Sequence, residues 1–188
     1  MRQKVIIKIN RKKLRKIFPT QNPFLSLATS IIYQQISTKA GDTIHKRFLL
    51  LFKNKKITPK NFFSLKKINI SKAGLSKQKL SYITDLANKF LDETIDPKLF
   101  SIMLDMEIKD HLIRVKGIGG WTADMFLIFA LNRKNVLPIG DLGIRKGFQK
   151  AFKLKNLPSE IHMKRLARPF DGRYTDLSLY LWGILDEK

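Results

Sequence analysis

The stretch LIRVKGIGGWTADMFLIFALNRKNVLPIGDLGIRKG, at residues 112–147, decides the fold and the chemistry that we expect of this chain. Its first part, residues 115–120, places three glycines between the end of one predicted helix and the start of an apolar one. Glycine permits positive φ and close approach of another backbone, so consecutive N–H groups can converge on an anion at the N-terminus of the next helix. We therefore expect a hairpin of bare backbone that binds phosphate.

The second part of the stretch carries a lone carboxylate, Asp141, on a turn bounded by Pro138 and Gly140 and followed directly by another predicted helix. Position alone favours an N-cap, a role that Asp often fills. The helix N–H groups and dipole would also keep the carboxylate ionised, and an ionised carboxylate can serve as a functional group as well as a cap. The two interpretations are compatible. Asp124, the nearest other carboxylate, is predicted to lie on the surface.

Composition limits the class of protein. The 188 residues suffice for one domain or for two small lobes, and we expect one compact unit. The longest apolar run, residues 125–131, is far shorter than the roughly 18 to 20 residues of a membrane span. The N-terminus lacks the features of a secretory signal, and the absence of cysteine indicates a reducing compartment. No iron–sulfur cluster or thiolate zinc site is expected, and the three histidines are not spaced as metal ligands.

The chain is strongly basic, with 37 Lys and Arg against 15 Asp and Glu. Asp42 is the only acidic residue among the first 84, so the N-terminal half carries most of the excess charge. Such a surface attracts polyanions and gives salt-dependent binding to nucleic acid. The alternative is an A/T-biased coding sequence, suggested by the many Ile and Asn residues, that raises the lysine content. Both interpretations apply to the acid-free run at residues 53–79.

Apolar periodicity predicts an all-α fold. Residues 1–23 are expected to form a basic, loosely attached arm, and residues 24–188 the main domain. Ser26 is a candidate cap of the first helix, and the aromatic residues of the 53–79 run are expected in the core. Helices are predicted at about residues 25–34, 39–52, 76–91, 105–113, 121–131, 142–152, 159–167 and 177–185, with short helices within 53–79.

Four ordered motifs resemble the signature of the helix-hairpin-helix DNA glycosylases, and most closely their alkylpurine (3-methyladenine) branch. They are IIYQQIS at residues 31–37, AGLSKQK at 73–79, VKGIGGWTADMFLIFALNR at 115–133 and LPIGDLGIRKG at 137–147. The resemblance extends over residues 24–186. It implies two small helical lobes around a DNA-binding cleft, in an enzyme of base excision repair that flips an alkylated purine out of the duplex and hydrolyses its N-glycosidic bond.

The resemblance also implies roles for individual residues. Asp141 falls on the catalytic aspartate. Contacts to the DNA backbone are implied for the hairpin, at Gly117, Gly119, Thr122 and Lys116. A monovalent cation, held by backbone carbonyls, would lie at Ile113, Val115 and Ile118. The sequence itself offers no evidence for that ion.

Other residues are candidates for contacts to bases. The candidates for the base pocket are Trp121, Tyr33, Met125, Phe170 and Gln35. Trp121 lies beside the hairpin, where an aromatic wall could stack on a flipped base. A core position is the alternative for Trp121, Tyr33, Met125 and Phe170, and packing within a buried helix is the alternative for Gln35. Ile36 or Ser37, in the loop after the two glutamines, is the candidate wedge that fills the gap left by the base. Ser37 is small, so flipping would be weakly supported if it were the plug.

One departure from the wider superfamily predicts the product. In glycosylases that also cut the strand, a lysine stands two places after the last motif glycine and forms a Schiff base with the sugar. Trp121 occupies that place here. We therefore predict a monofunctional enzyme that leaves an abasic site.

The expected partner is double-stranded DNA with damaged bases, bound by a monomeric enzyme without a cofactor other than the hairpin cation. We expect it in the cytoplasm with the nucleoid or, in a eukaryote, in the nucleus. Two alternatives stay open. One is a basic DNA-binding protein that uses the hairpin without catalysis and would not need Asp141. The other is a glycosylase for another damaged base, such as an oxidised purine or uracil.

Overall fold

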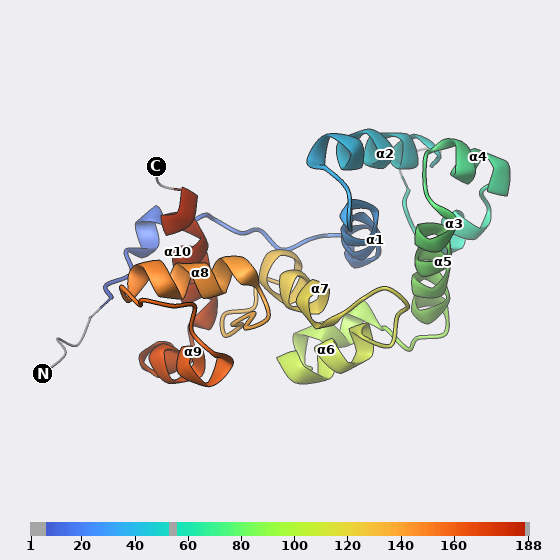
Figure 1. The fold of residues 1–188 in the computed structure, drawn as a ribbon. Helices are drawn as coiled ribbons and strands as arrows, with labels where there is room; N and C mark the ends of the chain where they lie inside the picture. The colour runs from blue at the N-terminus through green and yellow to red at the C-terminus, as the bar shows by residue number, and fades with distance from the viewer. Residues whose placement is uncertain (1–6, 53–55, 187–188) are drawn as a thin grey trace, which may run out of the picture. The chain divides into compact units, whose positions relative to one another are not determined.

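The computed structural model describes residues 7–52 and 56–186, and the regular secondary structure of these residues is entirely helical, without a β-strand (Figure 1). The predicted all-α class is confirmed. The chain forms two compact units: unit 1 joins the N-terminal segment up to Pro19 to the part from Leu127 onward, and unit 2 is Thr20–Phe126. No helix in the described part of the chain is long and apolar enough to cross a membrane.

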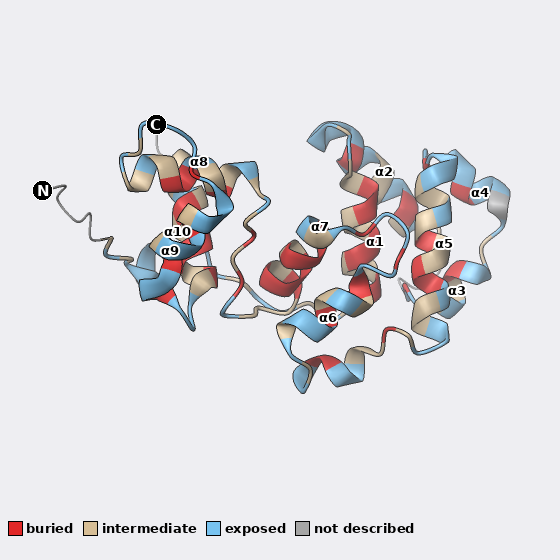
Figure 2. Ribbon diagram, turned by 60° about the horizontal axis from the view of Figure 1, so that its bottom comes forward, coloured by how far each residue is buried: buried red, intermediate tan, exposed pale blue. Residues whose placement is uncertain are grey.

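Unit 2 is built around the apolar helix α1, whose neighbours are α2 and α5. Asn22 caps α1 by accepting the Leu25 N–H at 2.9 Å, and Pro23 occupies the first turn, where its missing N–H is not needed. Ser26, predicted to be the cap, lies inside the helix instead. The buried side of α1 (red in Figure 2) carries Phe24, Leu27, Ala28, Ile31 and Ile32. The elements of unit 2 are α1 (Pro23–Tyr33), α2 (Thr38–Leu50), α3 (Pro59–Phe63), α4 (Lys67–Lys72), α5 (Lys77–Leu91), η3 (Pro97–Ser101), α6 (Asp105–Leu112) and α7 (Gly120–Met125).

The lysine-rich run forms the short helices α3 and α4, as predicted, although residues 53–55 lie outside the described part. Phe62 is buried and contacts Phe24 edge-on, so for this residue the predicted core position is confirmed. Phe63 is 46% exposed, and for it the prediction is wrong. Successive residues of a helix point about 100° apart. In the short helix α3 this direction takes Phe62 into the core and leaves Phe63 toward solvent.

The apolar helix predicted at residues 121–131 has two geometries. The α-helix α7 ends at Met125, and the chain continues as a π-helical turn, η4 (Phe126–Ala130). The boundary between the two units falls within this turn. Single π-helical turns are rare in proteins and are found disproportionately at functional sites.

Unit 1 is a small helical cluster in which α8 and α10 lie side by side (Figure 1). Gly147 permits this approach, because a Cβ there would lie 2.6 Å from the Leu181 carbonyl oxygen. The buried core consists of Ile144, Phe148, Met163, Ala167, Phe170, Leu177 and Leu181. The helices of unit 1 are η1 (Arg11–Lys13), α8 (Leu142–Ala151), α9 (Glu160–Ala167), η5 (Arg168–Phe170) and α10 (Tyr174–Asp186).

The described part of the N-terminal segment is packed, not loosely attached as expected. Ile7 and Ile9 lie against the core of unit 1. Arg11 Nε lies 2.5 Å from Asp176 Oδ2, and the Arg15 guanidinium stands 5.7 Å from the centre of the Phe129 ring. These contacts join residues more than a hundred positions apart, so no local pattern in the sequence could predict them.

Candidate active site

The glycine hairpin between α6 and α7 has one position at which only glycine fits. Gly117 has φ of +82°, and a Cβ there would lie 2.1 Å from a ring carbon of Tyr82. Both the backbone conformation and the close approach of α5 therefore require glycine. Gly119 is different, because a Cβ at this position would meet nothing within 4 Å. The open space beside Gly119 leaves the backbone accessible to a ligand.

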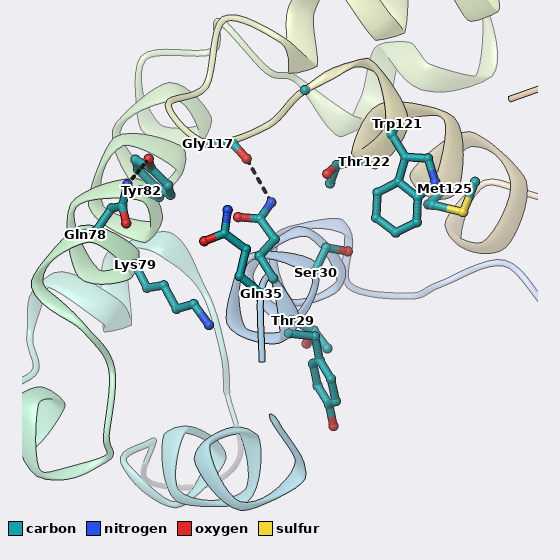
Figure 3. A pocket seen from close by; sticks show the side chains of 13 residues that line it. Thr29, Ser30, Gln35, Gln78, Lys79, Tyr82, Gly117, Trp121, Thr122 and Met125 are labelled. Carbon is teal, nitrogen blue, oxygen red and sulfur yellow. Dashed lines mark hydrogen bonds between the residues drawn. The ribbon is translucent and has the colours of Figure 1, made fainter. Parts of the chain in front are cut away.

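Side chains from the end of α1 and from α5 brace the hairpin, the first of them from Gln34 directly after α1. Gln34 Nε2 donates to the Gly117 carbonyl oxygen at 2.8 Å (dashed line in Figure 3). Asp85 Oδ2 accepts the backbone N–H of Lys116 at 2.8 Å, while the Lys116 residue itself is exposed. These bonds hold the loop in one conformation, so a ligand of the hairpin need not order it.

Beside the hairpin lies a cavity of about 760 Å³, wholly within unit 2 (Figure 3). Four of the five predicted base-pocket residues line it: Trp121, Tyr33, Met125 and Gln35. Trp121 is 52% exposed, which is the exposure expected of a cavity wall and not of a core residue. The remaining lining residues are Thr29, Ser30, Gln34, Gln78, Lys79, Tyr82, Gly117, Gly119 and Thr122. Amide, hydroxyl and aromatic groups thus surround a space large enough for a nucleobase.

Phe170, the fifth candidate, is not in this cavity. It is buried in the core of unit 1, and the Arg173 guanidinium stands 5.6 Å from the centre of its ring. The prediction of a pocket role is therefore wrong for Phe170, and the alternative of a core position is correct.

The loop that follows α1 contains both glutamines and the wedge candidates. Gln35 is exposed and has φ of +56°, a conformation that non-glycine residues rarely adopt and that is often found at functional loops. Ile36 is half-buried. The Ser37 hydroxyl accepts the Ala40 N–H at 3.3 Å and so serves as the N-cap of α2. Ser37 therefore has a structural role whether or not it touches DNA.

Two side chains of the cavity wall have perturbed proton affinities. Lys79 donates to the Ile32 carbonyl at 2.6 Å, at the C-terminal end of α1, and burial lowers the pKa of this lysine. The Tyr33 hydroxyl lies 2.5 Å from Asp42 Oδ1. That hydrogen bond, with burial and the charge of the carboxylate, raises the pKa of Tyr33. The ring of Tyr33 lies on Gly41, where a Cβ would approach it to 2.5 Å.

Asp141 lies in unit 1, at the end of the turn that begins at Pro138 and directly before α8. Its backbone N–H donates to the Pro138 carbonyl at 3.0 Å, and its Oδ1 accepts the Ile144 N–H at 2.8 Å. The predicted N-cap is therefore confirmed. The same Oδ1 accepts the indole N–H of Trp182 at 2.9 Å. The carboxylate is half-buried at the N-terminus of α8, where the helix dipole favours negative charge.

Trp182 is the residue that sequence analysis missed at this site. The apolar stripe of the last helix runs through Leu177, Leu181 and Ile184, and Trp182 does not belong to it. A tryptophan outside the apolar stripe is not explained by core packing of that stripe, and this was the feature of the sequence that could have indicated a role for Trp182. Its partner Asp141 lies 41 positions away, which no periodicity can indicate.

Asp124 does not lie on the surface, so this prediction is wrong. The residue is 9% exposed and pairs with Lys109 Nζ at 2.7 Å. Burial raises the pKa of Asp124, and the Lys109 partner opposes the shift. Asp124 lies on the side of α7 that faces α6. Its distance from the hairpin along the sequence does not indicate which side of the helix it occupies.

The three residues whose carbonyls are predicted to bind a cation differ in burial. Val115 and Ile118 are buried, and the Val115 carbonyl accepts the Ile118 N–H at 3.0 Å, whereas Ile113 is 47% exposed. The described residues contain no cluster of three or more His, Cys, Asp or Glu side chains that could hold a metal ion.

Known proteins are similar to this chain in fold and in sequence. The DNA-3-methyladenine glycosylase of Saccharomyces cerevisiae is 42% identical over 135 residues, which cover 68% of this chain and 46% of the yeast protein. The structure of a DNA-3-methyladenine glycosidase from Bacillus halodurans matches with a TM-score of 0.86 and 28% identity, over 93% of this chain and 82% of that one. The structure of a Schizosaccharomyces pombe 3-methyladenine DNA glycosylase in complex with abasic DNA matches with a TM-score of 0.79 and 26% identity. This match covers 94% of this chain and 87% of that one.

The family model of the HhH-GPD superfamily base excision DNA repair proteins matches residues 28–171. This span includes all residues that line the cavity in unit 2, the complete hairpin, and Asp141 in its turn. Because the match covers most of the chain and both candidate sites, the chain belongs to the HhH-GPD superfamily of base excision DNA repair proteins.

Proposed function

We propose that this protein is a monofunctional DNA glycosylase that removes alkylated purines of the 3-methyladenine type from duplex DNA. The observation that carries the proposal is the Asp141 carboxylate, held at the start of α8 by two hydrogen bonds in a chain of this superfamily. Relatives named for 3-methyladenine, among them one solved with abasic DNA, support the substrate class. A protein that only binds DNA would have no need of a positioned carboxylate.

Unit 2 supplies groups suited to holding a nucleotide. Backbone N–H groups of Gly117, Gly119 and Thr122, with the exposed Lys116, would contact phosphates, which carry no base information. The cavity beside them offers Trp121 and Tyr33 for stacking on an extruded base and amide groups for hydrogen bonds. An alkylated purine that carries a positive charge is attracted to the face of such aromatic rings.

Unit 1 supplies the charge that the reaction needs. When the N-glycosidic bond breaks, its electron pair leaves with the base and the deoxyribose becomes positive. Asp141 would stabilise that charge and orient the water that adds to C1′ and loses a proton. A base alkylated at N3 is already cationic and departs neutral, so it needs little acid assistance. One carboxylate is then sufficient.

The product follows from a residue that is missing. Trp121 stands where strand-cutting relatives in the wider superfamily carry the Schiff-base lysine. Without an amine at this place, water completes the reaction and the strand stays intact at an abasic site.

Further predictions from the sequence remain proposals. We propose that the loop at Ile36 and Ser37, with the exposed Gln35, enters the gap left by the base. A monovalent cation at the carbonyls of Ile113, Val115 and Ile118 would add positive charge beside a phosphate. The enzyme would act as a monomer on damaged duplex DNA, wherever the cell keeps that DNA: at the nucleoid or in a nucleus.

Incubation of the protein with methylated duplex, followed by chromatography of the released bases, tests the proposal. We expect free 3-methyladenine and an intact strand that breaks only on mild alkaline treatment. Release of uracil or an oxidised purine from matched substrates, without release of 3-methyladenine, would show that the protein is a glycosylase specific for a different base. If no substrate released a base, the protein would be a DNA-binding protein without glycosylase activity.

A further inference from the structure

The Asp141 carboxylate is held from two independent directions. Oδ1 accepts the Ile144 N–H, which is an ordinary helix cap and belongs to α8 itself. It also accepts the Trp182 indole N–H, which comes from α10. The cap would form without Trp182, so the second bond does not serve the helix. It restricts how the carboxylate can turn.

The indole that makes this bond is itself held by packing. The Phe129 ring stacks on it at 5.8 Å between ring centres, with 27° between the planes. Arg15, from the N-terminal segment, stands over the same Phe129 ring at 5.7 Å. All three side chains line a second cavity of unit 1, of about 710 Å³. The basic N-terminal segment thus helps to build the surroundings of the carboxylate.

Gly143 makes room for this arrangement. A Cβ there would lie 2.9 Å from Asp141 Oδ1 and 3.0 Å from Cδ1 of the Trp182 ring. The first distance is shorter than real Cβ contacts and the second is tighter than most of them, so the carboxylate would have to move and the indole would have to give way slightly. Glycine within a helix is unfavourable by about 1 kcal/mol relative to alanine. Its presence two residues after Asp141 is explained by the space that the pair needs.

We propose that Trp182 is a positioning residue for Asp141, and that Gly143 provides the space in which the indole reaches the carboxylate. The inference rests on the proposed catalytic role of Asp141. A charged group that is already oriented need not reorganise when positive charge develops on the sugar, and this preorganisation is a large part of enzymatic rate enhancement.

The sharpest test replaces Trp182 by its benzothiophene analogue, in which sulfur stands for the indole N–H. Shape and stacking on Phe129 are kept, and only the donor is lost. We expect single-turnover base release to fall about ten- to a hundredfold, as for loss of a hydrogen bond to a charged group. Affinity for DNA with an abasic-site mimic should stay unchanged. Gly143→Ala should lower the rate in the same direction, although alanine is the better helix former. Tyr180→Phe, on the same cavity, should leave the rate unchanged.

Two outcomes would overturn the proposal. A normal rate with the benzothiophene analogue would show that Trp182 acts through its ring alone. A loss of DNA affinity as large as the loss of rate would show that the N–H acts in binding. If the wild-type protein releases no base, the proposed function itself is refuted.

A second measurement tests the positioning without activity. The chain contains two tryptophans, Trp121 and Trp182, so a nitrogen–proton NMR spectrum has two indole signals, which Trp121→Phe assigns. We expect the Trp182 signal to shift in Asp141→Asn and in Gly143→Ala. An unmoved signal in both variants would mean that the indole does not bind the carboxylate in solution.

Discussion

The two units use a missing Cβ for opposite purposes. At Gly117 of unit 2, glycine permits a left-handed backbone and close approach of Tyr82, and the hairpin backbone forms one edge of the cavity. At Gly143 of unit 1, the backbone is helical, and glycine lets two side chains meet. Unit 2 is thus organised to present backbone to a ligand, and unit 1 to hold one carboxylate. The comparison predicts that substitutions in unit 2 affect binding, while those in unit 1 affect the rate.

The largest expected effect is in unit 1. Asp141→Asn should lower single-turnover release of methylated bases by about 10² to 10³ fold, the loss typical of one preorganised electrostatic contact. The fold should survive, because Asn caps a helix about as well as Asp. Affinity for duplex should be retained or rise, since a carboxylate near phosphates repels them.

Glu160→Gln is the matched control. This exposed acid lies in the first turn of α9, in the same unit, so the variant also removes a negative charge from a helix start. It should release bases normally. Asp124 would not serve as this control, because it is buried against Lys109. Near-normal release by Asp141→Asn would remove the proposed catalytic centre, and a collapsed melting temperature would leave only the cap.

In unit 2 the sharpest contrast is between two glycines of one hairpin. Gly117→Ala requires a left-handed alanine, which costs roughly 1–2 kcal/mol, and forces Tyr82 to move. Gly119→Ala meets open space and should leave the free energy of unfolding nearly unchanged. We expect Gly117→Ala to weaken binding to abasic-site DNA strongly. Thermal unfolding and DNA titration of both variants check this. Equal stabilities of the two variants would show that alanine is tolerated at position 117 without strain.

Much of the fold could be predicted from sequence because its signals are local. Ser76, Asp141 and Ser159 each precede an amphipathic run, and each proves to be the N-cap of the helix that follows. The stripe of α10 was equally clear. Caps and stripes depend on neighbours within a few positions, so a sequence displays them directly.

The site was predictable only where a motif marks it. The hairpin and Asp141 were found, but their supports were not: Tyr82 behind Gly117, and Trp182 on Asp141, act across long separations in sequence. Asp124 and Phe170 were misplaced for a related reason. Spacing along a helix indicates which residues share a face, but not whether that face is covered by another element.

Whether the basic surface of unit 2 binds DNA can be tested through salt. Four of the exposed lysines of the 53–79 run can be replaced together by Gln: Lys56, Lys60, Lys66 and Lys72. Each lost phosphate contact should reduce the slope of log affinity against log salt by about 0.9. Four exposed lysines of unit 1 provide the control, namely Lys146, Lys153, Lys155 and Lys164. A slope that does not change in the first variant would assign the run to coding bias.

The smallest effect concerns His45, behind the cavity wall of unit 2. Its Nε2 lies 3.1 Å from the Thr29 hydroxyl, and its ring packs against Tyr33 at 6.0 Å. Burial lowers the pKa of His45, and the nearby charge of Asp42 opposes the shift. The unfolded chain therefore takes up a proton near the ordinary value of 6.5, while the folded imidazole is still neutral. The contribution of His45 to stability is complete above this pH and is lost as the pH falls below it.

His45→Gln keeps a polar partner for Thr29 and removes the titration. Between pH 7 and pH 5, the melting temperature of the wild type should fall by a few degrees more than that of His45→Gln. His162→Gln, on α9 of unit 1, is the control for removal of a histidine from the other unit. Hydrogen exchange at α1 and α2 gives the local form of the same test, because their amides should lose protection in acid before those of α8 and α10. Parallel melting curves for wild type and His45→Gln would mean that the imidazole is as easily protonated in the folded unit as in the unfolded chain, and that the wall of the cavity is wetter than its packing indicates.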